Sequence, residues 1–280
     1  MSQHRMVRTP VGALAVRVRE SVPQRPSALL WHSLFVDDRS WSRVEDELAA
    51  ERRLVLVTGP GHGASSESGH RYTMEDCAEA AAVVLDALGI NDAVDWLGNA
   101  WGGHVGVVFA TQNPRRCRTL VTVGTPIHAY TAKDRVETRA LLLAYRLLGP
   151  ARFLRDAVSD VLLSPTTRAQ DPAAVELVRE CFNSADRSGL RNAVVSISLH
   201  RADLTPLLSR IEAPALFVTG SDHPDWTPEQ ATTASRLLPH GSVSVLEGAA
   251  YLAPLETPQE FVRLVREFWA NQGARSAAAT

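Results

Sequence analysis

Short apolar runs alternate with longer segments of helical periodicity along most of this chain. Several runs are rich in β-branched residues and bounded by glycine or proline, which is typical of parallel strands covered on both faces. The pattern predicts an α/β fold in which one sheet contains strands at residues 13–18, 28–32, 53–58, 93–97, 119–123, 215–219 and 242–246, with an extra N-terminal strand at 6–9.

Helical periodicity fills the segments between these strands. Residues 75–88 place Ala, Val and Leu three to four positions apart. Residues 258–269 begin with a proline, which is favoured in the first turn of a helix. We expect such helices to cover the two faces of the sheet.

The segment between strands 119–123 and 215–219 is about 90 residues long, too long for a plain loop. Its periodicity predicts helices at residues 136–148, 151–163 and 172–183. We therefore expect a helical cap at 127–205, inserted into a core of residues 1–126 and 206–272, with a flexible tail at 273–280. The leucine runs at 141–143 and 147–148 either line a pocket beneath the cap or pack onto the core.

Composition places the chain among globular proteins and disfavours several classes of partner. Hydrophobic residues make up 45% of the chain and charged residues 21%. Acidic and basic residues are spread along the sequence and give a net charge of −2. There is no basic stripe for nucleic acid, no apolar run near the roughly 20 residues that span a bilayer, and no apolar core of a signal peptide at the N-terminus. These features predict a cytoplasmic protein that binds neither nucleic acid nor membrane.

Three cysteines, Cys77, Cys117 and Cys181, lie far apart and form no CxxC or Cys/His spacing. Their odd number also argues against a disulfide framework. We expect buried thiols, no metal site and no cofactor.

A glycine-rich turn follows the strand at 93–97. The run Gly98-Asn99-Ala100-Trp101-Gly102-Gly103 has the spacing of the sharp strand-to-helix turn that projects a nucleophile above a sheet. Ala100 occupies the nucleophile position. Because alanine has no lone pair with which to attack a carbonyl, an acyl-enzyme cannot form there.

Three further segments make the sequence resemble the α/β-hydrolase family along nearly its whole length. Residues 29–34, Leu-Leu-Trp-His-Ser-Leu, look like the family's strand and oxyanion loop, with Ser33 in the usual glycine place. Residues 59–65 are similar to its PGHGxS loop, and residues 248–258 follow its terminal G-x-x-H-x-x-x-x-E-x-P segment in register. The resemblance implies a mostly parallel, doubly wound α/β-hydrolase sheet with an inserted helical cap.

Carried over residue by residue, the resemblance implies a degenerate catalytic triad. Tyr251 stands where the general-base histidine would be, and His223 stands where the family often keeps its orienting acid. Asp222 and Asp225 flank His223, so a small shift in register would restore a carboxylate. Replacement of a serine by Ala100 in an ordinary serine hydrolase explains only one of these changes, and repurposing of the site explains them all.

The backbone of the site is predicted to survive these changes. In this family the N–H groups of two residues, here Leu34 and Trp101, form the oxyanion hole. We expect Tyr251 and His223 to form a reversed dyad in which His223 orients or deprotonates the tyrosine hydroxyl. In the alternative, Tyr251 fills a cavity and His223 is a solvated loop residue.

Four other polar residues at the carboxyl edge of the sheet are candidates for the pocket lining: His32, Ser33, Asn99 and His128. Asn99 either donates a hydrogen bond to a ligand or holds the turn. The side chain of Trp101 is expected to form a wall of the pocket.

Our main interpretation is that the protein is a cofactor-free enzyme that binds a small hydrophobic carbonyl compound. It would catalyse non-hydrolytic proton transfer, as in isomerisation, epimerisation or cyclisation. One alternative is a hydrolase of ester, amide or C–C bonds that activates water directly, or a serine hydrolase inactivated by serine-to-alanine replacement. Another is a non-catalytic ligand-binding protein. The sequence leaves open whether the chain forms a homodimer.

Overall fold

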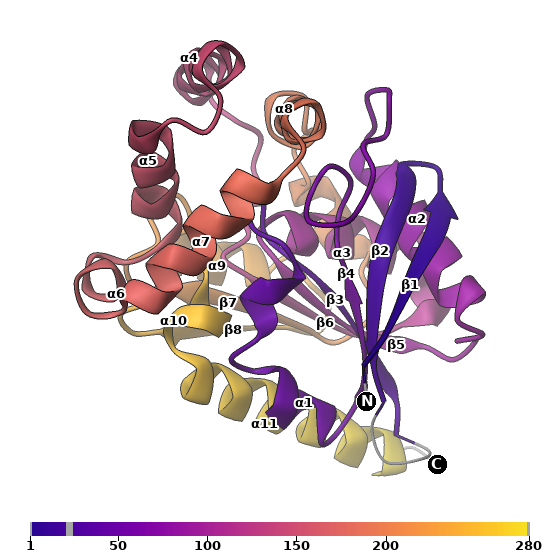
Figure 1. Cartoon of the computed structure of the whole chain (residues 1–280). Coiled ribbons are helices and arrows are strands. Elements are labelled where there is room, and N and C mark those ends of the chain that lie inside the picture. The colour runs from indigo at the N-terminus through magenta and orange to yellow at the C-terminus, as the bar shows by residue number, and fades with distance from the viewer. Residues whose placement is uncertain (1, 21–24, 279–280) are drawn as a thin grey trace.

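The computed structural model describes residues 2–20 and 25–278, which form one eight-stranded sheet with helices on both faces (Figure 1). Along the sheet the order is β1-β2-β4-β3-β5-β6-β7-β8. Strand β2 is antiparallel to β1 and β4, and the other neighbours are parallel. The strands are β1 (Ser2–Thr9), β2 (Gly12–Arg19), β3 (Ser27–Trp31), β4 (Arg53–Val57), β5 (Val94–Asn99), β6 (Cys117–Val123), β7 (Ala215–Gly220) and β8 (Gly241–Leu246).

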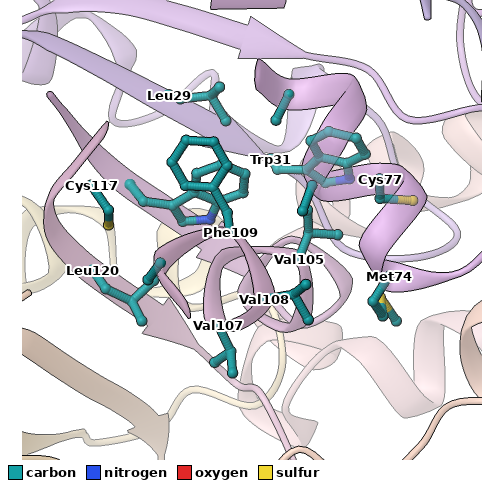
Figure 2. Packing of buried hydrophobic residues seen from close by; sticks show 14 of the residues in the cluster. Leu29, Trp31, Met74, Cys77, Val105, Val107, Val108, Phe109, Cys117 and Leu120 are labelled. Carbon is teal, nitrogen blue, oxygen red and sulfur yellow. The ribbon is translucent and has the colours of Figure 1, made fainter. Parts of the chain in front are cut away.

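Every predicted strand is confirmed, and so is the α/β fold class with its mostly parallel sheet. The central strands are buried along most of their length, so their side chains alternate between two apolar layers. In β3, Leu29 and Trp31 pack with α2 and α3 on one face, whereas Ala28 and Leu30 pack with α1 and α11 on the other. Figure 2 shows part of the first layer, including Trp31, Cys77 and Phe109.

The helices of the core differ from the predicted ones mainly at their ends. Helix α11 does not stop at residue 269 but continues to 278, so the predicted flexible tail begins inside a helix, and residues 279–280 lie outside the described residues. Three short helices of the core, at residues 45–49, 228–235 and 253–256, were not predicted, because their hydrophobic residues show no clear helical period. The core helices are α1 (Glu45–Ala49), α2 (Met74–Ala87), α3 (Trp101–Gln112), α9 (Pro228–Ser235), α10 (Ala253–Glu256) and α11 (Pro258–Ala278).

The segment between β6 and β7 carries five further helices, which lie together beside the upper left of the sheet in Figure 1. They are α4 (Ala132–Leu148), α5 (Arg152–Leu162), α6 (Pro165–Gln170), α7 (Pro172–Ser184) and α8 (Arg187–Val194). A π-helical turn at Val195–Leu199 follows α8. All of these elements lie within the predicted cap at 127–205, so we refer to them as the cap.

Three observations bear on the other predictions. The cysteines are free and buried, as predicted. Among residues 2–20 and 25–278, no helix is both long and apolar enough to cross a membrane. No group of three metal-ligating side chains occurs in the same part of the chain. The cytoplasmic location and the homodimer stay predictions.

Candidate functional site

The turn between β5 and α3 holds its centre in a strained backbone conformation. Ala100 has φ 46° and ψ −102°, and its N–H donates to the carbonyl of Val123 at 2.7 Å. A residue with a Cβ in such a region costs about 1–3 kcal/mol and persists only where the surroundings enforce it. The geometry of a nucleophile elbow is therefore present, although the side chain at its apex is a methyl group.

The glycines of this turn are required by close approach of the backbone. A Cβ on Gly98 would lie 2.1 Å from the carbonyl oxygen of Gly102, and one on Gly102 would lie 1.9 Å from that of Trp31. Both contacts are far shorter than a van der Waals contact. The helix α3 can thus start directly above the end of β3 and β5.

Two backbone donors face the turn without a partner. Trp101 is the first residue of α3, so its N–H has no acceptor within the helix. Over residues 2–20 and 25–278, neither this N–H nor that of Leu34 donates to another protein group. The two non-glycine residues with positive φ in that part of the chain, Ala100 and Phe35, adjoin these donors.

The loop that carries Leu34 is braced by His32, which is completely buried. Its Nδ1 donates to the carbonyl of Ser33 at 2.7 Å, and its Nε2 accepts from the N–H of Gly59 at 2.8 Å. Burial lowers the pKa of His32, which keeps the ring neutral. Both ring nitrogens are therefore used in joining two loops, and Ser33 is buried beside it.

At the opposite side of the site, the Tyr251 hydroxyl donates to Asp225 Oδ2 at 2.6 Å. The sequence predicts His223 as its partner, but no hydrogen bond joins the two side chains in the described residues. Instead, the His223 and Tyr251 rings are in contact, with centroids 3.8 Å apart and planes inclined at 42°. Spacing along the loop could not reveal that Asp225, rather than His223, extends to the tyrosine.

The ionisation of these groups follows from their surroundings. Burial, with Asp225 beside it, raises the pKa of Tyr251 well above its usual value, so the hydroxyl stays protonated. Burial lowers the pKa of His223 to about 4. Because His223 Nδ1 accepts from the N–H of Asp225 at 3.1 Å, the proton of the neutral ring is on Nε2. His223 therefore has no free lone pair with which to act as a base.

The three candidates for the acid position thus separate into distinct places. His223 is buried against Gly124, at the position that the resemblance assigns to the acid. Asp225 is exposed and reaches Tyr251. Asp222 is exposed and accepts from the hydroxyl of its neighbour Ser221 at 3.1 Å, away from Tyr251.

The remaining predicted residues also have defined surroundings. The Asn99 amide donates to the carbonyls of Val123 and Tyr251, so it holds the turn. His128 is half-buried, with its ring 6.2 Å from that of Trp226. The prediction that the Trp101 side chain forms a pocket wall is wrong, because the indole is 2% exposed and packs on Trp31 in the core beneath the turn.

Comparisons with known proteins agree with this geometry. Residues 29–164 match the family model described as alpha/beta hydrolase fold. A thermophilic esterase from Thermogutta terrifontis superposes with a TM-score of 0.87 at 24% identity, over 96% of this chain and 99% of the other. The enol-lactonase from Burkholderia xenovorans LB400 superposes with a TM-score of 0.84 at 22% identity, over 96% and 100% of the two chains.

The chain has the α/β-hydrolase fold. Two sequence relatives extend the comparison. A 3-oxoadipate enol-lactonase 2 from Acinetobacter baylyi is 24% identical over 85% of this chain and 86% of the relative. A 2-hydroxy-6-oxononadienedioate/2-hydroxy-6-oxononatrienedioate hydrolase 1 from Dechloromonas aromatica is 26% identical over 80% and 78%.

In this α/β-hydrolase fold a small apolar pocket, with about 10 Å³ of free volume, lies between the cap and Phe35 of the oxyanion loop. The pocket is lined by Phe35 together with cap side chains that include Leu141, Tyr145, Leu154 and Phe182. The rings of Phe35 and Phe182 meet edge to face, 5.9 Å apart. Of the two leucine runs, Leu141 and Leu142 line this pocket, which is one of the two alternatives that the sequence leaves open, whereas Leu143, Leu147 and Leu148 are exposed.

Glu256, a residue to which the sequence assigns no role, joins this cap to the loop that carries Tyr251. Its Oε2 accepts from the N–H of Ser164 at 2.7 Å and from the Thr167 hydroxyl at 3.0 Å. Its Oε1 accepts from the N–H groups of Ala250 at 2.9 Å and Leu252 at 3.1 Å. The glutamate of the terminal motif therefore ties the cap to both neighbours of the tyrosine.

The cap also touches the core backbone to backbone. A Cβ on Gly61 would lie 2.5 Å from the carbonyl carbon of Gly189 in α8, and the N–H of Asp186 donates to the Gly61 carbonyl at 3.2 Å. Helix α8 therefore packs directly on the PGHGxS-like loop. The glycines in that motif permit this contact, which the resemblance alone did not indicate.

Proposed function

We propose that the protein is a hydrolase that binds the carbonyl of a small apolar ester, lactone or ketone and directs water onto it without an acyl-enzyme. The relatives and structural neighbours named above are all hydrolases, of lactones, of an oxo-dienedioate or of esters. They favour the hydrolase alternative over non-hydrolytic isomerisation, epimerisation or cyclisation. The apolar lining beneath the cap supports a hydrophobic substrate.

The observation that carries this proposal is the strained turn at Ala100. Strain of about 1–3 kcal/mol is kept at a position whose side chain can attack nothing. The strained turn fixes the direction of the Trp101 N–H. This N–H and the Leu34 N–H would together bind a carbonyl oxygen and stabilise the negative charge that develops on it. The attacking water would take the place next to the Ala100 methyl group where a serine hydroxyl would otherwise stand.

Tyr251 and Asp225 would move the protons. As water attacks the carbonyl carbon, it passes a proton to the Tyr251 oxygen, and Tyr251 passes its own proton to Asp225. When the intermediate collapses, the proton returns by the same route to the leaving oxygen or carbon. His223 would hold the tyrosine ring in place, since its own lone pair is occupied by the Asp225 N–H.

The test measures hydrolysis of p-nitrophenyl butyrate and the lactone dihydrocoumarin. We expect slow turnover without an initial burst and without fluorophosphonate labelling, because no acyl-enzyme forms. Tyr251→Phe and Asp225→Asn should each lower kcat by about 10²-fold or more, the usual size of a general acid–base contribution. Tyr72→Phe is the matched control, because the buried Tyr72 hydroxyl has no hydrogen-bond partner in the described residues.

Absence of any turnover, or turnover that survives Tyr251→Phe, would overturn the proposal. The first outcome would favour a ligand-binding protein without catalysis. Covalent labelling of the wild-type protein by the fluorophosphonate would also contradict it, since another nucleophile would then be acting.

A further inference from the structure

Arg201 is a buried cation surrounded by neutral groups. Its side chain follows the π-helical turn that ends the cap, and the residue is 5% exposed. One terminal nitrogen donates to the Pro126 carbonyl at 2.6 Å and lies 2.8 Å from His104 Nε2, and the other donates to the His128 carbonyl at 2.9 Å. His104 Nε2 also lies 2.7 Å from the Pro126 carbonyl, to which it can only donate. Burial, reinforced by Arg201, keeps the pKa of His104 well below its usual value, so the ring is neutral.

No carboxylate balances this guanidinium. In the described part of the chain no acidic oxygen lies within 4.0 Å of it. The charge of Asp203 acts on Arg201, but the Asp203 carboxylate accepts from the N–H of Thr205 at 2.8 Å and forms no ion pair with the guanidinium. Burying an unpaired charge costs several kcal/mol, and such a cost is normally offset by an anion.

The guanidinium also has an unused donor. Arg201 Nε is buried and has no hydrogen-bond partner in residues 2–20 and 25–278. The Nε–H and the adjacent terminal N–H form the edge of the guanidinium that matches the two oxygens of a carboxylate. π-helical turns, such as the one before Arg201, frequently mark functional sites.

Arg201 lies near Tyr251, which with Asp225 forms the proposed proton-transfer pair. Its guanidinium is 5.8 Å from the centre of the Tyr130 ring, and its charge acts on the Tyr251 hydroxyl. Tyr130, His128 and Tyr251 are half-buried whereas Arg201 is 5% exposed, so an anion would have to enter between these three residues to reach the guanidinium. A small anion placed here would sit beside the site and not in a separate pocket.

We propose that Arg201 binds a carboxylate of the substrate, which would therefore be an apolar carbonyl compound carrying a carboxylate group. This inference rests on the proposed function, because it assigns the anion to the same site. A carboxylate would complete the hydrogen bonding of the guanidinium and neutralise it. The reacting carbonyl would lie toward Ala100 and the apolar part of the substrate beneath the cap.

Binding of 4-oxopentanoate and of its methyl ester, measured by calorimetry with chromatography to verify that the ester stays intact during the titration, tests the inference. These probes share a ketone and differ in one negative charge. We expect the acid to bind the wild-type protein at least about tenfold more tightly than the ester, as a charge-assisted pair provides. Arg201→Gln should abolish this preference, Arg201→Lys should retain part of it, and Arg139→Gln, on an exposed arginine of α4, should leave it unchanged.

Thermal unfolding separates binding from folding in these variants. A purely structural Arg201 would lower Tm on substitution without changing the ratio of the two affinities. If Arg201→Gln does not fold, Arg201→Lys still decides, because a ratio equal to that of the wild type in a variant whose hydrogen bonds are altered would contradict the inference. Equal binding of acid and ester to the wild type would overturn it directly.

The two proposals can fail separately. If wild-type protein hydrolyses dihydrocoumarin but does not prefer the acid, hydrolysis stands and the carboxylate site is wrong. If the protein prefers the acid through Arg201 but hydrolyses neither ester nor lactone, the carboxylate site stands and the hydrolytic proposal is wrong.

Discussion

The side-chain amide of Asn99 donates to the backbone carbonyl of Tyr251 at 2.6 Å, across the site from the last residue of β5 to the terminal loop. The same amide donates to the carbonyl of Val123 at 3.0 Å. Asn99 therefore connects the turn at Ala100 with the backbone of Tyr251. It is a positioning residue, since both amide hydrogens are used by the backbone.

Asn99→Ala should lower the free energy of unfolding by about 1–3 kcal/mol, the cost of leaving one buried carbonyl without a donor. Only the Tyr251 carbonyl loses its donor, because Val123 also accepts from the Ala100 N–H and the Thr125 hydroxyl. Urea unfolding measures the change. Asn91→Ala, on an exposed residue, is the control, and equal stability of the two variants would contradict the role of Asn99.

Ala100→Gly should stabilise the protein, by up to about 1 kcal/mol. Glycine relieves the strain of positive φ, and this gain exceeds the added entropy of the unfolded chain. Ala87→Gly, at the exposed end of α2, should instead destabilise by up to about 1 kcal/mol. A loss of stability at position 100 as large as that at position 87 would mean that the turn is not strained.

Ala100→Ser alone should create no esterase and no fluorophosphonate labelling. A serine at the elbow needs a histidine as its base. Tyr251 cannot take this role, because its pKa is raised and its hydroxyl donates to Asp225. The triple variant Ala100→Ser, Tyr251→His, His223→Asp restores the order of a triad and should gain at least about 10²-fold in kcat/KM over Ala100→Ser. Rapid ester hydrolysis by the single variant would instead identify an ordinary serine hydrolase inactivated at one position.

His223 should make stability depend on pH between about 4 and 6.5, the interval between its lowered pKa and the usual value. In this interval His223 binds a proton in the unfolded chain but stays neutral in the folded protein. The stability present above pH 6.5 is therefore lost as the pH falls toward 4, by about 3 kcal/mol in all. His223→Asn retains an acceptor for the Asp225 N–H and should flatten this part of the curve of unfolding free energy against pH.

Other buried histidines contribute to the same curve, so the comparison between variants is decisive. His200→Asn, which removes an exposed histidine, is the control. If His223→Asn and the wild type lose stability equally between pH 6.5 and 4, the His223 ring is not held neutral by burial.

The sheet could be predicted from the sequence because each strand is a distinct apolar run between turn residues. The elbow could be placed because its glycines are enforced by contacts with Trp31 and Gly102. The partner of Tyr251 could not be predicted, because Asp222, His223 and Asp225 lie within one turn, and their directions depend on hydrogen bonds to β7 and to the loop that follows β8. The His223 N–H donates to Gly220 and that of Asp222 to Ala249, which turns the ring inward and leaves Asp225 outside.

Arg201 had no signal in the sequence. A single arginine after an apolar segment is normally a solvated residue, and only the packing of the cap onto α3 and the β6 loop buries it. The direction of the Trp101 indole was likewise hidden, because the first residue of a helix can place its side chain toward the ligand or toward the core. Here the space above Cys77 and beside Trp31 accommodates it.

The contact between Gly61 and Gly189 determines how the cap can move. Two backbones already touch there, so α8 cannot approach the core any further. At the far side of the cap, no ion pair joins α4 or α5 to the core in the described residues, and their pairs are internal to the cap. The cap is thus fixed to the core by backbone at α8, whereas α4 and α5 meet it through apolar side chains that pack with Phe35 and Val36.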